Sequence, residues 1–388
     1  MQPMEQALSE VTERINTAAA TRTPLRIRGG GSKDFYGQSL QGEVLDTTGL
    51  AGIISYEPSE LVVTAGAGTT LDELETLLAK HGQSLAFEPP HFAWSGAGAG
   101  QGPSTVGGMV ASGLSGPARA SVGGVRDYVL GLKMINGKGE HLSFGGQVMK
   151  NVAGYDVSRL MAGAMGTLGL ITEVSLKVLP VAPAEATLMF ELNQSDALEQ
   201  LHRWGGEPLP LNASCWVHDD SARTSPTRDL LFVRLRGAVA AVEAACQKML
   251  GEQPGKRMDQ QQATADWELC RNQALPFFNA AQPDNFALWR LSVAQTTPAL
   301  QLPWAQLVEW HGALRWLWAP HDAGEQLQAA ASSAGGFATT FVAAQAQPAR
   351  ATHRFAMQSA TQTAVARRLK ASFDPQGIFN PGRLFADL

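Results

Sequence analysis

The sequence predicts an α+β fold divided into more than one domain. Its 388 residues exceed what one hydrophobic core usually supports, so two or three domains are expected. Glycine and tryptophan are unevenly distributed: 29 of the 40 glycines precede residue 170, whereas eight of the nine tryptophans follow residue 200. After the prolines at 180 and 183, strands and helices alternate, which is typical of an antiparallel sheet with helices on one face.

The first half reads as short strands and helices separated by glycine-rich turns. Thr70 is a natural N-cap, and Asp72 and Glu73 in the first turn favour a helix there. Asn136-Gly137 predicts a hairpin turn. Residues 88–104 contain too many prolines and glycines for regular structure. Predicted helices cover 3–20, 70–81, 105–111 and 156–161; predicted strands cover 25–28, 44–46, 53–56, 61–65, 129–135, 140–144 and 170–178.

The second half predicts an antiparallel sheet with helices, followed by a linker at 344–351 and a basic C-terminal helix within 364–384. Predicted strands cover 187–191, 213–218, 230–236, 288–293, 312–318 and 337–341; predicted helices cover 195–203, 239–250 and 323–333. We therefore expect three parts: residues 1–180, residues 181–345, and a tail of residues 346–388 that returns to the first domain.

Composition excludes several classes of protein. Thirty Lys and Arg against 35 Asp and Glu give a net charge of −5, which argues against nucleic-acid binding. No apolar run of about 18 residues predicts a membrane span, and the N-terminal residues lack the pattern of a signal peptide. We expect a cytoplasmic protein, with membrane contact at most peripheral and through a partner.

Cysteine and histidine spacing predicts no metal site. Cys215, Cys246 and Cys270 lie far apart without a C-x-x-C, which excludes a disulfide scaffold and a self-contained iron–sulfur or zinc–thiolate site. The histidines form no H-x-H or H-x-x-x-H pair and are more typical of surface or hydrogen-bonded residues. They are His81, His91, His141, His202, His218, His311, His321 and His353.

Two glycine-rich segments are candidate anion sites. Arg28-Gly29-Gly30-Gly31-Ser32 follows a predicted strand, and consecutive glycines can turn several amides toward one anion. Ser104–Gly113 opens a helix capped by Thr105, whose first-turn amides would suit a diphosphate. The alternatives are a simple turn and a closely packed helix. Neither the Rossmann nor the Walker pattern fits. Two more glycine-containing segments follow, at 121–127 and 163–172.

The order of these segments carries a resemblance. RGGGS, STVGGMVASG, SVGGVRDYVLGL and KNVAGYDVSRLMAGAMGTLGLITEVSLKV, with the terminal FDPQGIFNPGRL, resemble the PCMH-type FAD-binding domain of the vanillyl-alcohol-oxidase flavoproteins. Within this superfamily the sequence is similar to the FAD-binding subunits of bacterial glycolate oxidases. The resemblance implies FAD between two α+β subdomains, and residues 181–345 as an α+β cap domain.

The resemblance also implies cofactor-binding residues. The first cradle would comprise Arg28, Gly29, Gly30, Gly31, Ser32 and Lys33, and the second Thr105, Gly107, Gly108, Ser112 and Gly113. Ser121, Gly123 and Asp127 would approach the cofactor, Ile171 would meet the adenine, and Pro89 and Asn380 would lie beside the flavin. Lys150, Tyr155 and Asp156 are supporting candidates, although Asp156 equally suits a helix cap.

Two departures from the family's pattern shape the functional prediction. Covalent members place a histidine after the first glycines; Ser32 stands there, so FAD should be bound non-covalently. Longer relatives that oxidise 2-hydroxy acids carry a His-x-Gly-Asp-Gly-Asn-x-His segment, which this sequence lacks. The catalytic base is therefore not identified. Arg290, Arg354 and Arg383 are candidate anchors for a substrate carboxylate, because arginine binds carboxylates bidentately.

The leading functional hypothesis is an FAD subunit that oxidises glycolate, or D-lactate, to the 2-oxo acid. Because no cluster ligands are present, electrons would pass to an iron–sulfur subunit, beside a longer flavoprotein subunit. A second hypothesis makes the chain an FAD-binding assembly or electron-relay subunit, with catalysis on the longer homologous subunit. A third is a free-standing flavin oxidase.

Overall fold

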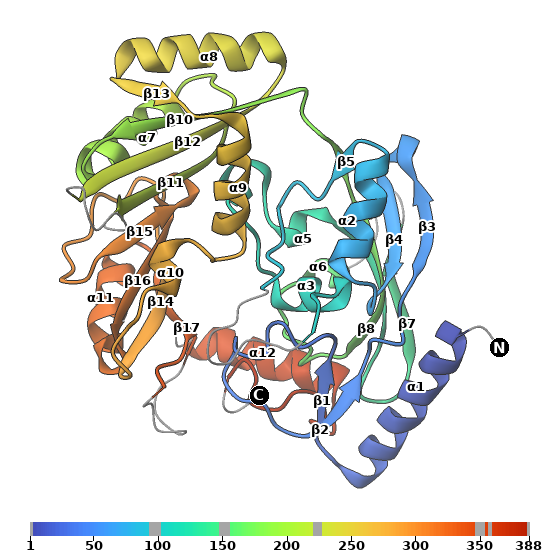
Figure 1. The fold of residues 1–388 in the computed structure, drawn as a ribbon. Coiled ribbons are helices and arrows are strands. Elements are labelled where there is room, and N and C mark those ends of the chain that lie inside the picture. The colour runs from blue at the N-terminus through green and yellow to red at the C-terminus, as the bar shows by residue number, and fades with distance from the viewer. Residues whose placement is uncertain are drawn as a thin grey trace. The chain divides into compact units, whose positions relative to one another are not determined.

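The computed structural model describes residues 3–92, 102–146, 156–219, 227–345, 354–355 and 359–385 (Figure 1). The chain divides into two compact units. Unit 1 comprises Met1–Leu114, Gly124–Val181 and Met357–Leu388; unit 2 comprises Ser115–Gly123 and Ala182–Ala356. Within the described residues, no helix is long and apolar enough to cross a membrane.

Unit 1 is built on a five-stranded antiparallel sheet with the order β3-β4-β8-β6-β7. Its strands are β3 (Ile53–Glu57), β4 (Val62–Gly66), β6 (Val129–Ile135), β7 (His141–Gly145) and β8 (Leu170–Lys177). The helices α2 (Leu71–Lys80) and α3 (Val106–Ser112) contribute to the same hydrophobic core. Thr70 caps α2 as predicted, because its hydroxyl accepts the Glu73 amide.

A second, smaller core in unit 1 joins the two ends of the chain. The parallel strands β1 (Leu25–Arg28) and β2 (Glu43–Asp46) pack with α1 (Pro3–Thr21) and the buried Ile378 and Phe379. The Leu25 amide donates to the carbonyl of Ile378 at 2.7 Å. The remaining elements of this unit are η1 (Pro58–Glu60), β5 (Gln83–Ser84), α5 (Val125–Tyr128), α6 (Val157–Leu160), β9 (Leu179–Pro180) and α12 (Ala360–Phe373).

Unit 2 contains an eight-stranded antiparallel sheet with the order β13-β10-β12-β11-β15-β16-β14-β17. The strands are β10 (Ala184–Glu191), β11 (Leu211–Asp219), β12 (Arg228–Gly237), β13 (Gly255–Arg257), β14 (Phe286–Ser292), β15 (Gln306–Glu309), β16 (Leu314–Pro320) and β17 (Phe337–Val342). The helical elements are α4 (Arg119–Val122), α7 (Gln194–Gly205), α8 (Val239–Glu252), α9 (Gln260–Arg271), α10 (Pro276–Asn279), η2 (Trp310–Gly312), η3 (His321–Ala323) and α11 (Gly324–Ser333).

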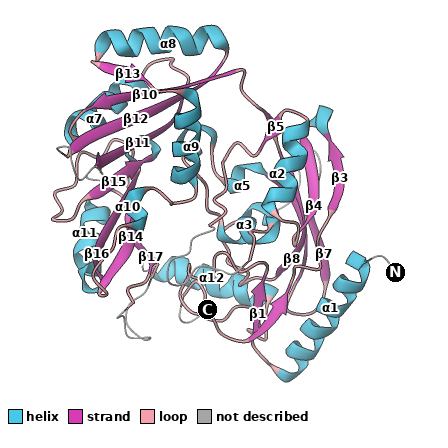
Figure 2. Cartoon of the chain, viewed as in Figure 1, coloured by secondary structure: helices cyan, strands magenta, loops and turns pink. Residues whose placement is uncertain are grey.

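The two faces of this sheet differ in what covers them. One face packs against α7, α8 and α11 through large apolar side chains. On the other face, the Trp267 indole of α9 donates to the Thr187 hydroxyl of β10 at 2.9 Å. Figure 2 shows α7 and α11 on one side of the strands and α9 on the other. The structure confirms the α+β prediction, but helices cover both faces of this sheet rather than one.

The short segment Ser115–Gly123 corrects the predicted first domain, because it belongs to unit 2. The Trp310 indole donates to the Gly116 carbonyl at 3.0 Å, and the Arg119 guanidinium lies 4.5 Å from the centre of the Trp310 ring. These contacts join the segment to the β15–β16 turn. The tail groups with unit 1 only from Met357, later than the predicted boundary at 346.

Candidate cofactor-binding site

The glycine-rich segments of unit 1 surround one cavity of about 110 Å³. Its walls come from the loop after β1, the start of α3, the turn at 165–169 and the C-terminal segment. Segments that are far apart in the sequence therefore meet at one place. The described lining residues are Ile27, Arg28, Gly29, Gly30, Gly31, Ser32, Lys33, Asp34, Thr47, Ala67, Thr105, Gly107, Gly108, Ala111, Ser112, Met165, Gly166, Gly169, Ile171, Asn380 and Arg383.

The loop after β1 offers backbone donors to this cavity. Among the described residues, none accepts a hydrogen bond from the amides of residues 29–32. Gly31 has a φ of +81°, which glycine adopts without strain. A Cβ at Gly30 would overlap the carbonyl oxygen of Pro103, so only glycine fits this close backbone approach. Unpaired amides in such a turn suit an anion.

The start of α3 contributes close packing rather than free donors. Thr105 caps the helix, and its hydroxyl accepts the Gly108 amide at 3.3 Å. The amides of the two residues between them donate to the carbonyls of Ala67 and Thr69, at 2.8 and 2.9 Å. The expectation of free first-turn amides here was wrong, because tertiary contacts already satisfy them. The closely packed helix considered as the alternative describes this segment better.

Lys33 places a half-buried cation beside the cavity. Its Nζ lies 2.8 Å from Ser104 Oγ, 3.2 Å from Ser32 Oγ and 5.6 Å from the centre of the Phe92 ring. No carboxylate of the described residues pairs with it. Desolvation lowers the pKa of Lys33 from its ordinary 10.5 to about 7. A half-buried ammonium that no described carboxylate neutralises is a good partner for an anionic group.

Arginines reinforce the positive charge of the same wall. Arg26 and Arg28 share one carboxylate, with their guanidinium nitrogens 3.1 and 2.9 Å from Asp34 Oδ2. Arg383 donates to the backbone carbonyls of Lys33 and Asp34, at 3.0 and 3.2 Å, and so supports the loop from the C-terminal segment. The cationic groups outnumber the single carboxylate, which favours a negatively charged ligand.

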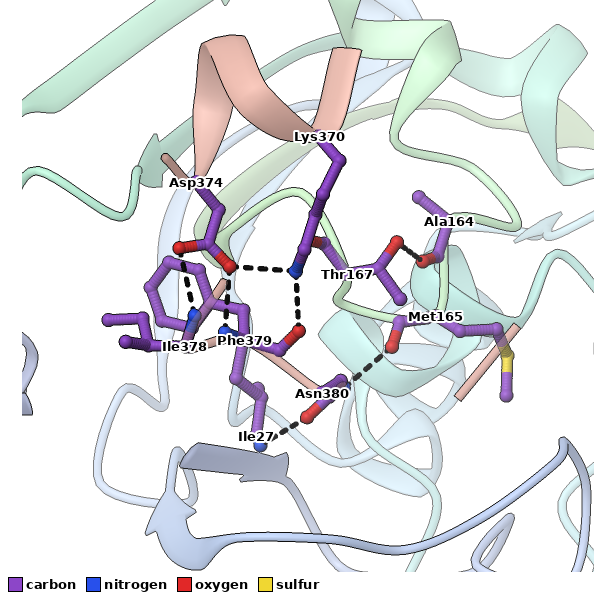
Figure 3. A network of polar contacts seen from close by, with 9 residues as sticks. All are labelled: Ile27, Ala164, Met165, Thr167, Lys370, Asp374, Ile378, Phe379 and Asn380. Carbon is purple, nitrogen blue, oxygen red and sulfur yellow. Dashed lines mark hydrogen bonds and ion pairs between the residues drawn. The ribbon is translucent and has the colours of Figure 1, made fainter. Parts of the chain in front are cut away.

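Asn380 ties the C-terminal segment to two walls of the cavity (Figure 3). Its Oδ1 accepts the Ile27 amide at 2.8 Å, and its Nδ2 donates to the Met165 carbonyl at 2.6 Å. Ile27 lies in β1 just before the glycine loop, and Met165 precedes Gly166 in the facing turn. Asn380 has a φ of +42°, a region that asparagine tolerates better than most residues. The side chain therefore orients both loops.

A buried ion pair fixes the segment that follows α12 (Figure 3). Lys370 Nζ lies 2.7 Å from Asp374 Oδ2 and donates to the carbonyls of Thr167 and Phe379, also at 2.7 Å. The fully buried Asp374 carboxylate accepts the amides of Ile378 and Phe379, at 3.1 and 2.8 Å. Desolvation lowers the pKa of Lys370, and the Asp374 charge opposes that shift.

Most residues predicted to contact the cofactor line the cavity. They are Arg28, Gly29, Gly30, Gly31, Ser32, Lys33, Thr105, Gly107, Gly108, Ser112, Ile171 and Asn380. Sequence reasoning did not single out Asp34, Thr47, Ala67 and Met165, which come together only through the fold. Gly166 and Gly169 could have been named, because the sequence shows their spacing in the 163–172 segment.

Five predicted residues lie outside this lining, and their contact with the cofactor stays a prediction: Pro89, Gly113, Ser121, Gly123 and Asp127. The Ser121 hydroxyl lies 3.0 Å from His311 Nε2, within unit 2. The Asp127 carboxylate accepts the Gly124 amide and caps α5. Gly113 and Gly123 end α3 and α4.

The supporting candidates divide in a similar way. Asp156 caps α6, because its carboxylate accepts the Arg159 amide at 3.1 Å, so the capping alternative describes it. Lys150 and Tyr155 lie outside the described residues.

In the part of the chain that the structure describes, no group of three or more His, Cys, Asp or Glu could hold a metal ion. His91 lies 3.0 and 3.2 Å from the carboxylates of Asp72 and Glu75.

The structure separates the three candidate carboxylate anchors. Arg383 is committed to backbone carbonyls beside the glycine loop. Burial lowers the pKa of Arg354, whose carbonyl accepts the Thr340 amide. Arg290 lies in unit 2 with its guanidinium 5.1 and 5.8 Å from the ring centres of Trp310 and Trp316. None of the described residues accepts a hydrogen bond from its buried Nε, so this nitrogen of Arg290 is a donor that the described residues leave unused.

A cationic glycine cradle closed by a returning C-terminal segment defines a class of protein, the FAD-linked oxidases. Residues 6–145 match the family described as FAD binding domain, and residues 353–384 match FAD linked oxidases, C-terminal domain. The cofactor is FAD, and Lys33 and the amides of residues 29–32, which no described residue accepts from, fit its diphosphate. With 41% identity over 97% of its length to the glycolate oxidase subunit GlcE, the chain belongs, more narrowly, to the family of that subunit.

The similar proteins differ in sequence identity and in how much of the chain they cover. GlcE of Escherichia coli (strain K12) is 41% identical over 376 residues, which are 97% of each chain. Glycolate oxidase subunit GlcD of Bacillus subtilis (strain 168) is 30% identical over 194 residues, 49% of this chain and 39% of the relative. The solved 4-ethylphenol oxidase from Gulosibacter chungangensis has a TM-score of 0.70 at 13% identity, over 98% of this chain and 88% of that one, and shows the fold alone.

Proposed function

We propose that the chain is the FAD-containing subunit of a multi-subunit 2-hydroxy-acid dehydrogenase. It would oxidise glycolate, or D-lactate, to the 2-oxo acid and pass electrons to an iron–sulfur partner, beside a longer flavoprotein subunit. The observation that carries the proposal is the Lys33 ammonium, which pairs with no carboxylate of the described residues, beside the amides of residues 29–32, for which no described residue is an acceptor. The identity to GlcE over nearly the whole chain, and the likeness of half the chain to GlcD, support the subunit role.

The residues of the chain would then perform two tasks. Lys33 and the amides after β1 would hold the FAD diphosphate, while Asn380 and Arg383 keep the surrounding loops in place. When bound, FAD would supply the acceptor for the hydride, which carries both electrons of a hydroxy-acid oxidation. Arg290, whose guanidinium lies 5.1 and 5.8 Å from the ring centres of Trp310 and Trp316, would be the anchor for the substrate carboxylate.

Anaerobic titration of the purified FAD-loaded chain with glycolate tests the function. We expect glycolate to bleach the visible flavin absorbance of the wild type. Arg290→Met should raise the glycolate concentration needed for half-maximal bleaching by about 100-fold, because it removes a bidentate ion pair worth about 3 kcal/mol. Arg290→Lys keeps the positive charge but cannot bind a carboxylate bidentately, so its half-maximal glycolate concentration should lie between those of the wild type and Arg290→Met. Wild-type flavin that glycolate and D-lactate both leave unbleached would contradict substrate oxidation on this chain.

The electron-relay hypothesis remains the second candidate. The missing histidine segment favours it. In that case the isolated chain would bind FAD without bleaching, whereas the complex with its longer partner would bleach both flavins. Pull-down of the tagged chain from its native cells should recover both partner subunits under either hypothesis. A fully active chain without partners would favour a free-standing oxidase.

Lys33 makes FAD binding depend on pH. Below pH 7 the side chain of Lys33 is a charged ammonium in the empty site, and above pH 7 it is a neutral amine. Binding of the diphosphate raises the pKa of Lys33, so above pH 7 the amine takes up a proton when FAD binds. Affinity should therefore fall as pH rises above about 7, by up to tenfold per unit. Calorimetry in buffers of different ionisation enthalpy should find no proton uptake at pH 6 and nearly one proton at pH 8.5.

Lys33→Met should abolish this proton uptake, and its matched control is Lys133→Met. Lys133 is half-exposed and pairs with Glu173 at 2.9 Å, away from the cavity lining. The folded, empty wild type should also gain stability between pH 7 and 9, by up to about 1.4 kcal/mol per unit, because the unfolded lysine still binds the proton. Unchanged uptake in Lys33→Met would contradict the assignment.

FAD should leave the protein on acid or heat denaturation. Ser32 stands in the linkage position, its Oγ is 2.8 Å from Ser104 Oγ, and the described cavity lining contains no histidine or cysteine. Yellow fluorescence that stays with the chain through denaturing electrophoresis would rule this out.

A further inference from the structure

Unit 2 contains a second and larger cavity, of about 510 Å³, that the proposed function does not use. It lies between the helices α9 and α10 and the sheet face that carries Cys215. Trp216, the next residue of β11, points into the opposite core. The lining residues are Thr187, Cys215, Val217, His218, Asp219, Leu230, Phe232, Met258, Ala263, Asp266, Trp267, Cys270, Leu275, Pro276, Phe277, Ala280, Gln282, Phe286, Pro303, Trp304, Ala305 and Trp318.

Aromatic rings form much of this wall. Trp267, Trp304 and Trp318 all line the cavity. The Trp267 indole N–H is bonded to the Thr187 hydroxyl, and that of Trp318 donates to the Phe277 carbonyl at 3.0 Å. Because the indole N–H groups of Trp267 and Trp318 are engaged, these two rings offer hydrocarbon faces and edges, which suit another flat π-system.

We call the part of the wall formed by Cys215 and Cys270 the floor of the cavity. Its hydrogen-bonding groups are engaged with residues behind the lining. The Cys270 thiol donates to Glu309 Oε1 at 2.8 Å, and the Trp316 indole donates to Glu309 Oε2 at 2.6 Å. Cys215 lies beside Cys270, and both thiols are buried. Burial raises the pKa of Glu309. A ligand that reaches this floor therefore needs few hydrogen bonds of its own.

Charge excludes the ligands of the first site. Asp219 and Asp266 line the cavity, and His218 Nδ1 lies 2.6 Å from the carboxylate of Asp229. No lysine or arginine is among the lining residues that the structure describes. A cation near the wall is Arg234, whose guanidinium lies 4.7 Å from the centre of the Trp267 ring and donates to Asn212 Oδ1. A carboxylate or phosphate in the cavity would meet the acidic groups of the lining first, which disfavours hydroxy acids and the FAD diphosphate here.

We infer that this cavity binds a flat, uncharged aromatic molecule. Its volume falls in the range of small-molecule sites, its walls are aromatic, its polar groups are largely engaged, and its charge is acidic. The inference goes beyond the proposed function and does not depend on it, because every lining residue belongs to unit 2.

The test uses the FAD-loaded chain with 2-naphthol and 2-naphthoate, which share one ring system and differ in charge at pH 7. We expect calorimetry to show saturable, one-to-one binding of 2-naphthol and at least tenfold weaker binding of 2-naphthoate. Trp304→Ala should weaken 2-naphthol binding about tenfold, whereas Phe337→Ala, an exposed aromatic on β17 outside the lining, should not. Asp266→Lys should bring 2-naphthoate to within a few-fold of 2-naphthol.

Thiol footprinting locates the bound ligand. N-ethylmaleimide is uncharged, and mass spectrometry reports its reaction at each cysteine. Saturating 2-naphthol should slow the labelling of Cys215 and Cys270 by about tenfold and leave Cys246 unchanged, because Cys246 lies in the core beneath α8. Equal protection of all three thiols, no binding of 2-naphthol, or protection only when a partner subunit is added would each overturn the inference.

Discussion

Gly108→Asp is expected to weaken FAD binding by about 100-fold or more while unit 1 stays folded. Gly108 lines the cavity, and a Cβ there would have one close neighbour, Thr105 Oγ1 at 3.2 Å, so the Thr105 side chain must shift by a few tenths of an ångström to admit a short side chain. The new carboxylate would face the diphosphate in a desolvated site, where like charges repel strongly. A 100-fold change corresponds to about 2.7 kcal/mol, and flavin fluorescence titration measures it.

Gly108→Asn is the matched control, because it adds nearly the same volume without the charge. We expect it to weaken binding only a few-fold. Ser32→Ala should also be mild, since the backbone amides rather than the hydroxyl would contact the cofactor. If Gly108→Asp and Gly108→Asn lost the same FAD affinity, the added volume rather than the charge would be the cause. If Gly108→Asp bound FAD as well as the wild type, the diphosphate would lie elsewhere.

The sequence predicted the cradle through residues whose role is local. A triple glycine after a strand and a threonine before a helix can be recognised without the fold, because backbone freedom and N-capping depend on neighbours in the chain. The structure places these segments around one cavity. Asn380 could be named only through the resemblance, because its two partners, Ile27 and Met165, lie hundreds of residues away.

The errors have a common physical origin in long-range contacts. The amides at the start of α3 looked free because the carbonyls of Ala67 and Thr69, which accept from them, follow a distant strand. Arg383 looked like a substrate anchor until the fold committed it to the glycine loop. The helix α9 was missed because its sequence, QQQATADWELCR, buries only Ala263, Trp267 and Cys270, too few apolar positions for a clear helical period. With α9 missed, the second cavity was missed too.

The Lys370→Met variant should cost unit 1 about 3–5 kcal/mol of stability, because it leaves the fully buried Asp374 carboxylate without its cation. It also leaves the carbonyls of Thr167 and Phe379 without their shared donor. Urea unfolding of the FAD-free chain measures the loss. FAD affinity should fall as well, since the segment that carries Asn380 is released from the cavity wall.

Two further variants test whether the loss of stability in Lys370→Met comes from leaving the buried Asp374 charge without a partner. Lys248→Met removes a lysine whose partners, Glu207 and Glu252, lie on the surface, and the unfolding midpoint should not change measurably. Adding Asp374→Asn to Lys370→Met removes the stranded charge but keeps an acceptor for the buried amides, so the double variant should lose less than the two single losses together. Strict additivity, or a loss below about 1 kcal/mol for Lys370→Met, would contradict the claim that this buried pair holds the C-terminal segment on the cofactor site.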